Sequence, residues 1–161
     1  VSGRPRAVAG VPPDYFAADG QLWGNPLYDW QAMRSEGFRW WRARIAAALR
    51  RFDLLRLDHF RGFESHWAVP ADATTARGGA WRPTPGDALL DAFARDLGAL
   101  AGSAEVDLPF VAEDLGVITP EVDALRRRWA LPGMHVVQFG FDGSGDNPHL
   151  PHMHRHRSVA Y

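Results

Sequence analysis

The chain has 161 residues, the size of one ordinary domain, with 18 basic and 19 acidic side chains and a formal net charge of −1. With this balance the chain has no overall positive potential that would attract nucleic acid. No apolar run approaches the roughly 18 residues of a membrane span. Cysteine is absent, which excludes disulfides, thiolate metal sites and a cysteine nucleophile, and fits a cytoplasmic protein. Every basic residue is arginine. The segment therefore lacks the lysine that a Schiff-base enzyme or a Walker-type phosphate loop requires.

The first half of the chain is predicted to contain one helix and one strand. Residues 10–26 are rich in Gly, Pro, Asp and Asn and are expected to form a loop. Apolar side chains at helical spacing predict a helix over 35–52. The apolar run over 54–58 predicts a buried strand. Residues 61–85, rich in Gly, Pro, Ala and Thr, are expected to form a long loop.

The second half alternates helices and strands. The pattern predicts a helix over 86–100, a strand over 109–114, a helix starting at Thr119-Pro120-Glu121, a strand over 135–141, a polar loop over 142–157 and a strand from 158. Strands that alternate with helices indicate an α/β fold with a parallel sheet, either doubly wound or part of a barrel. A complete barrel needs about 250 residues, so this single structural unit can supply about half of one.

Two predicted strands end in carboxylates, Asp58 and Glu113. The carboxyl ends of parallel strands line the active sites of such folds. Two carboxylates there suit glycosyl transfer, with one as nucleophile and the other as acid and then base. Arg56, two residues before Asp58 on the same strand face, would keep Asp58 ionised. From the pattern alone, capping carboxylates and a structural ion pair remain equally open.

Four stretches resemble the amylomaltases, the glucan-disproportionating branch of the alpha-amylase superfamily. The family's nucleophile strand resembles RLDHFRGF at 56–63, and its acid/base strand resembles AEDLG at 112–116. Its acceptor-side loop is similar to GVPPDYF and GQLWGNP within 10–26, and the approach to its third carboxylate is similar to 147–161. The resemblance implies a partial TIM (β/α)8 barrel. Residues 1–161 would be the central part of that catalytic domain, with the nucleophile strand over 54–63 and the acid/base strand over 109–116.

The resemblance also implies roles for individual residues. Asp58 would be the nucleophile, Glu113, rather than Asp114, the acid/base, and Arg56 the support of the nucleophile. Substrate contacts are implied for Asp14, Gln21, Trp23, His59 and Phe139. Trp23 would stack on an acceptor glucose, His59 would lie near sugar hydroxyls, and Phe139 would border the cleft.

The implied activity is that of a 4-alpha-glucanotransferase. A segment of a 1,4-alpha-glucan would pass to the 4-hydroxyl of glucose or another glucan, through a covalent glucosyl–Asp58 intermediate and without a cofactor. Maltooligosaccharides would be the partners. In the family a third carboxylate follows the Ser-Val-Ala-Tyr segment, whereas this chain stops at Tyr161 and starts at a valine. We therefore expect a piece of a longer protein that is inactive and poorly stable by itself.

Other interpretations remain open at this stage. The segment could belong to an amylase-type hydrolase, or it could be a non-catalytic glucan-binding module or an inert fragment. An acceptor platform such as Trp23 favours transfer over hydrolysis. Four histidines, His149, His152, His154 and His156, are expected to lie in a solvated loop that borders the cleft and not in a metal site. The run Arg126-Arg127-Arg128 is expected to be the solvated end of a helix.

Overall fold

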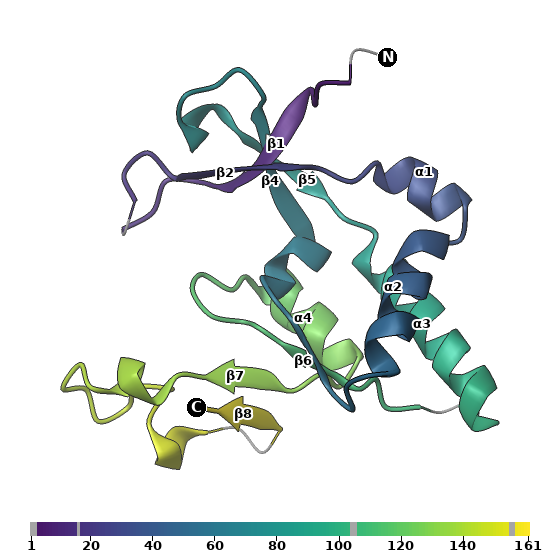
Figure 1. The fold of residues 1–161 in the computed structure, drawn as a ribbon. Helices are drawn as coiled ribbons and strands as arrows, with labels where there is room; N and C mark the ends of the chain where they lie inside the picture. The colour runs from purple at the N-terminus through teal and green to yellow at the C-terminus, as the bar shows by residue number, and fades with distance from the viewer. Residues whose placement is uncertain (1–2, 16, 104–105, 155–156) are drawn as a thin grey trace.

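The computed structural model describes residues 3–15, 17–103, 106–154 and 157–161 (Figure 1). Phe16 of the acceptor-side motif and His156 lie outside the described residues. The helices are α1 (Trp30–Ser35), α2 (Arg39–Leu49), α3 (Gly86–Ala101) and α4 (Pro120–Arg128). The strands are β1 (Ala7–Val11), β2 (Gln21–Pro26), β3 (Leu55–Leu57), β4 (Ser65–Pro70), β5 (Ala80–Pro83), β6 (Phe110–Ala112), β7 (Gly133–His135) and β8 (Ser158–Ala160).

Parallel strands form the part of the fold that the sequence predicts. β3 pairs with β6 in parallel, and β7 pairs with β8 in parallel. The Ala112 N–H donates to the Pro132 carbonyl at 2.8 Å, which brings the start of β7 beside β6. Helix α3 precedes β6 and α4 connects β6 to β7, as in successive βα units. The described residues form a mixed α/β fold without a closed barrel.

Two segments expected to be loops contribute to a second, antiparallel sheet. Its strand order is β2-β1-β4-β5, and it lies above the parallel strands in Figure 1. The loop prediction over 10–26 is wrong at its ends, because β1 and β2 pair there as a hairpin. The prediction of one long loop over 61–85 is also wrong, because β4 and β5 pair within it. The 3-10 helix η1 (Phe60–Phe63) directly follows the end of β3 and leads into β4.

The main core lies between the β3–β6 pair and helices α2, α3 and α4. Phe60, Leu89, Phe93 and Phe110 are almost completely buried in it. In α3 the apolar side chains recur every three or four residues, as predicted, and the helix ends at Gly102, whose φ of +66° suits glycine. A smaller cluster is formed by Val8 and Val69, which lie on β1 and β4 of the antiparallel sheet, together with Ala76.

The helix predicted over 35–52 is shorter, because it corresponds to α2 alone, and α1 before it was not predicted. Phe38 takes a left-handed conformation with φ +55° and is buried, so α1 and α2 are separate helices on either side of it. The strand predicted over 135–141 is wrong for most of its length, because β7 ends at His135 and a short 3-10 helix, η3 (Val137–Gly140), follows it.

Arg126 contradicts the prediction of a solvated arginine cluster at the end of α4. Its side chain is buried and forms ion pairs with Asp114 and Asp123. The other two arginines of the run remain exposed. Within the described ranges, none of the helices combines the length and the apolar character needed to cross a bilayer.

Candidate active site

Asp58 and Glu113 occupy equivalent positions at the ends of two neighbouring strands. The parallel register pairs Leu57 with Ala112, the residues immediately before them. The Glu113 N–H donates to the Leu57 carbonyl at 3.0 Å, and the Phe60 N–H donates to the Glu113 carbonyl at 3.0 Å. The two carboxylates therefore leave adjacent strands at the same edge, as the sequence predicts for a pair that acts on one bond.

Glu113 and Asp114 have different surroundings although they are consecutive. The Glu113 carboxylate accepts hydrogen bonds from the His59 N–H at 2.8 Å and the Leu115 N–H at 3.1 Å, and it lines a cavity. The Asp114 carboxylate accepts from the Met134 N–H at 2.8 Å and lies 3.2 Å from the buried Arg126. Asp114 therefore joins α4 to β7, whereas Glu113 faces the space beside the hairpin.

Arg56 lies beside Asp58, as the shared strand face predicts. The Arg56 Nη1 is 2.5 Å from the Asp58 Oδ1, and the Arg56 Nε contacts the Met134 sulfur at 3.4 Å. The Arg56 side chain is half-exposed and that of Asp58 is mostly exposed. A pair this open to water contributes little to stability, so its contribution is to hold the carboxylate in one orientation.

His59 connects the two carboxylates and adopts a constrained backbone. Its φ is +48°, a conformation that is uncommon for residues other than glycine. Burial lowers the pKa of its imidazole, while the nearby carboxylates of Glu113 and Asp58 oppose that shift. His59 directly follows Asp58, and its left-handed backbone directs its N–H toward the Glu113 carboxylate.

The β1–β2 hairpin carries the predicted acceptor-side residues. Gln21 and Trp23 lie on β2, where the Trp23 indole N–H donates to the Gln21 side-chain oxygen at 3.0 Å. Asp14 lies in the connection between the strands, and its carboxylate accepts from the Ala17 N–H at 2.8 Å. Gly20 closes the connection with φ +68°, and a Cβ there would lie 2.4 Å from the Val11 carbonyl oxygen, so only glycine fits.

Two cavities meet at the ring pair of Trp23 and His59, whose centroids are 5.0 Å apart in an edge-on arrangement. The first, the Glu113 cavity, has a volume of about 420 Å³ and is also lined by Asp14 and Gln21. The second, the Asp58 cavity, has a volume of about 520 Å³ and continues to an aromatic wall. That wall is formed by Tyr28, Trp30, Trp41, Phe63 and Trp67.

The structure does not bring Phe139 to these cavities. Phe139 lies on η3, exposed, with its ring edge-on to His149 at 5.4 Å. The ring of the buried His135 contacts the rings of His149 and His154. Among the residues that the structure describes, no group of three His, Cys, Asp or Glu side chains has the geometry of a metal site.

Sequence reasoning missed Arg61 and Trp81, which both line the Glu113 cavity. Trp81 lies on β5, inside the segment that is expected to be a loop. Trp67 on β4 and Trp81 are directly paired across the two strands. Aromatic pairs across neighbouring strands stabilise sheets, so the two tryptophans that flank residues 68–80 are the signal that could have identified the position.

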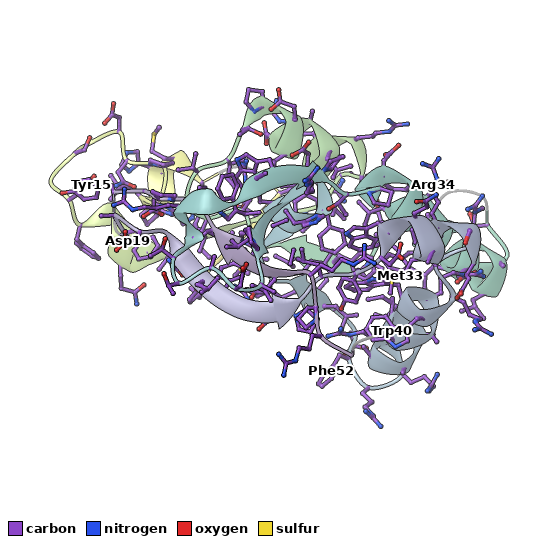
Figure 2. The ribbon with its side chains drawn as sticks, turned by 90° about the horizontal axis from the view of Figure 1, so that it is seen from above. Tyr15, Asp19, Met33, Arg34, Trp40 and Phe52 are labelled. Carbon is purple, nitrogen blue, oxygen red and sulfur yellow. The ribbon has the colours of Figure 1, made fainter. Side chains whose placement is uncertain are left out.

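Figure 2 shows Tyr15 and Asp19 of the β1–β2 connection at one end of the molecule. Tyr15, almost fully exposed, marks the connection between β1 and β2 on one side. Met33 and Trp40 lie on α1 and α2 at the other side (Figure 2). The hairpin tip is thus open to solvent, and the Glu113 cavity is lined both by Asp14 of the hairpin connection and by Glu113 at the end of β6.

Comparison with known proteins identifies relatives for almost the entire chain. The sequence model of one family, described as 4-alpha-glucanotransferase, matches residues 4–161. A 4-alpha-glucanotransferase of Thermus thermophilus is 53% identical over 150 residues, and one of Synechocystis is 52% identical over 150 residues. Both alignments cover 93% of this chain and 28% of the relative, so the chain spans a little over a quarter of these proteins.

Solved structures agree with the sequence comparisons. The amylomaltase of Streptococcus agalactiae in complex with acarbose superimposes with a TM-score of 0.87 and 40% identity, over 98% of this chain and 30% of that one. The amylomaltase of Corynebacterium glutamicum superimposes with a TM-score of 0.78 and 25% identity, over 96% of this chain and 21% of that one. The family match extends over nearly all residues, and the chain therefore belongs to the 4-alpha-glucanotransferase family.

Proposed function

We propose that this chain contributes the nucleophile and the acid/base to a 4-alpha-glucanotransferase. The complete protein would transfer a segment of a 1,4-alpha-glucan to the 4-hydroxyl of glucose or of another glucan. The observation that carries the proposal is the β3–β6 register, which positions Asp58 and Glu113 at adjacent strand ends. Membership of the family supports the same substrate class.

The proposed reaction is a retaining double displacement. An oxygen of Asp58 attacks the anomeric carbon while the glycosidic C–O bond breaks, and Glu113 gives its proton to the departing sugar oxygen. The 4-hydroxyl of the acceptor then attacks the same carbon. Glu113 takes the hydroxyl proton, and the bond to Asp58 breaks. Arg56 would position Asp58 throughout, because its guanidinium contacts the carboxylate directly.

The acceptor side is assigned from the two cavities. Glu113 must reach the oxygen of the departing sugar, so the Glu113 cavity is the space for leaving group and acceptor, and the Asp58 cavity is adjacent to the donor. Trp23 forms a boundary of both cavities and is 42% exposed. Its ring offers a stacking surface to an acceptor sugar, with Gln21 fixing the ring plane through the indole N–H. Asp14 and His59 are the further proposed substrate contacts, and Phe139 is proposed only as a residue near the border of the cleft.

We further infer that the parallel strands belong to a (β/α)8 barrel whose remaining strands lie outside this chain. Strands β3, β6, β7 and β8 follow one another in space in chain order, with α3 and α4 between successive strands. Catalytic side chains at the carboxyl ends of such strands are the rule for this fold.

The proposal is tested by two isosteric substitutions in the complete protein, Asp58→Asn and Glu113→Gln. Each should reduce the disproportionation of maltotriose by at least about 10³-fold, with the melting temperature nearly unchanged. Glu36→Gln is the matched control, because Glu36 is exposed and its ion pair with Arg39 is a long surface contact of 3.9 Å. Near-normal activity of either catalytic-site variant would disprove the assignment. Glucose release in place of longer maltodextrins by the unaltered protein would indicate hydrolysis.

A further inference from the structure

The Glu113 cavity is lined by a second tryptophan besides the proposed acceptor platform, Trp23. Trp81 and Trp23 come from different ends of the antiparallel sheet, β5 and β2, and both line this cavity. Trp81 is 38% exposed although it lies in a sheet, close to the 42% of Trp23. Large aromatic side chains with this much open surface inside a cavity are candidates for ligand contact.

Trp81 is held in place by Arg61. The Arg61 guanidinium carbon lies 4.0 Å from the centroid of the Trp81 ring, within the range of a cation–π contact. The Arg61 Nη1 also donates to the Val117 carbonyl at 3.2 Å, so the ring is tied to the loop that follows Glu113. Trp67 contacts Trp81 edge-on at 5.3 Å. These contacts fix the ring before any ligand arrives, which reduces the entropy cost of binding.

We propose that Trp81 and Arg61 form a second sugar position in the Glu113 cavity, occupied by the second glucose unit of an oligosaccharide acceptor. The inference rests on the proposed function, because it takes the Glu113 cavity as the acceptor side. The cavity volume of about 420 Å³ lies within the roughly 300–1,000 Å³ of small-molecule sites. Trp81 lines the cavity with 38% of its surface exposed, so the part of its ring that Arg61 does not cover offers apolar surface to pyranose C–H groups, and the Arg61 guanidinium offers N–H donors to sugar hydroxyls.

The proposal predicts that the affinity for longer acceptors depends on Trp81, whereas the rate of the chemical step does not. A glucose acceptor reaches only the first position beside Trp23, whereas maltose also reaches Trp81. Loss of the ring should therefore raise the KM for maltose and leave the KM for glucose within twofold of its original value. We expect a rise of about tenfold for maltose, which corresponds to about 1.4 kcal/mol of binding free energy.

The experiment measures transfer from α-maltotriosyl fluoride to glucose or maltose by the complete protein. Trp81→Leu keeps an apolar side chain against Trp67, and Trp81→Phe keeps a ring and should restore most of the affinity for maltose. Trp40→Leu is the matched control, because Trp40 is also exposed but lies on α2, outside both cavities. Melting curves of all variants establish that they fold.

An equal rise in KM for glucose and maltose in Trp81→Leu, or no change for either, would overturn the second position. If the unaltered protein transferred to neither sugar, the proposed function itself would fail. Calorimetric titration with maltose then still tests the site: weaker binding to Trp81→Leu than to Trp40→Leu would support it, and equal binding would refute it.

Discussion

Asp114 provides the sharpest contrast with the proposed acid/base, because it is the adjacent residue and is also a carboxylate. Asp114→Asn removes the charge that faces Arg126 but keeps an oxygen that can accept from the Met134 N–H. The side chains of Asp114 and Arg126 are only 12% and 7% exposed. A hydrogen bond to a charged group contributes about 1.5–3 kcal/mol. Arg126 still keeps Asp123 at 2.8 Å, so we expect a loss near the middle of that range, about 2 kcal/mol.

The assay for Asp114→Asn is urea denaturation of the complete protein, with the free energy obtained from the midpoint and the m-value. The turnover of the folded variant should remain within a few-fold of normal, because Asp114 points toward α4 and β7. Glu113→Gln is the matched comparison and should show the opposite result, with turnover lost and the midpoint retained. An Asp114→Asn variant that is stable but inactive would refute the division of roles between the two neighbours.

Three other predictions concern residues around the same site. Arg56→Lys should lower turnover by roughly 10- to 100-fold without changing the melting temperature, since an ammonium cannot contact Asp58 and Met134 together as the guanidinium fork does; unchanged steady-state kinetics would contradict this. Trp23→Ala should impair transfer to glucose more than cleavage of the donor, measured as product ratios, and equal losses would make Trp23 a structural anchor. Burial lowers the pKa of His59 below about 6.5, its value in the unfolded chain, so its contribution to stability is complete above that pH and declines as the pH falls. His59→Asn should therefore flatten the loss of stability that sets in as the pH falls below about 6.5 in denaturation experiments, and an unaltered slope would exclude His59 as a source.

The sequence predicted the elements whose cause is local. The apolar runs that end at Asp58 and Glu113 became β3 and β6, because a short buried strand between polar residues is visible without its partner. The face shared by Arg56 and Asp58 followed from strand alternation alone. Helix α3 followed from the regular spacing of its apolar residues, and the predicted range of 86–100 ends one residue before the observed helix.

Elements that depend on distant partners were not predicted. β4 pairs with β1, more than fifty positions earlier in the chain, and its mixture of small, polar and aromatic residues resembles a loop until that partner is known. The burial of Arg126 could not be predicted from the sequence either, since its partner Asp114 lies on the loop after β6. Phe38 breaks a continuous helical pattern because its side chain enters the core from a left-handed backbone. Phe139 was associated with the site by resemblance, and its position on η3 next to His149 leaves that role a proposal.

The central claim is that Asp58 forms a covalent bond to the transferred sugar, and trapping that bond tests it most directly. Glu113→Gln in the complete protein would be mixed with α-maltotriosyl fluoride. Fluoride departs without an acid, so the first displacement proceeds, while loss of the base slows the second. Peptide mass spectrometry should find one maltotriosyl group on the peptide that contains Asp58, and none when Asp58→Asn is added. A sugar on a different carboxylate, or an unmodified protein that still turns over the fluoride, would contradict the account.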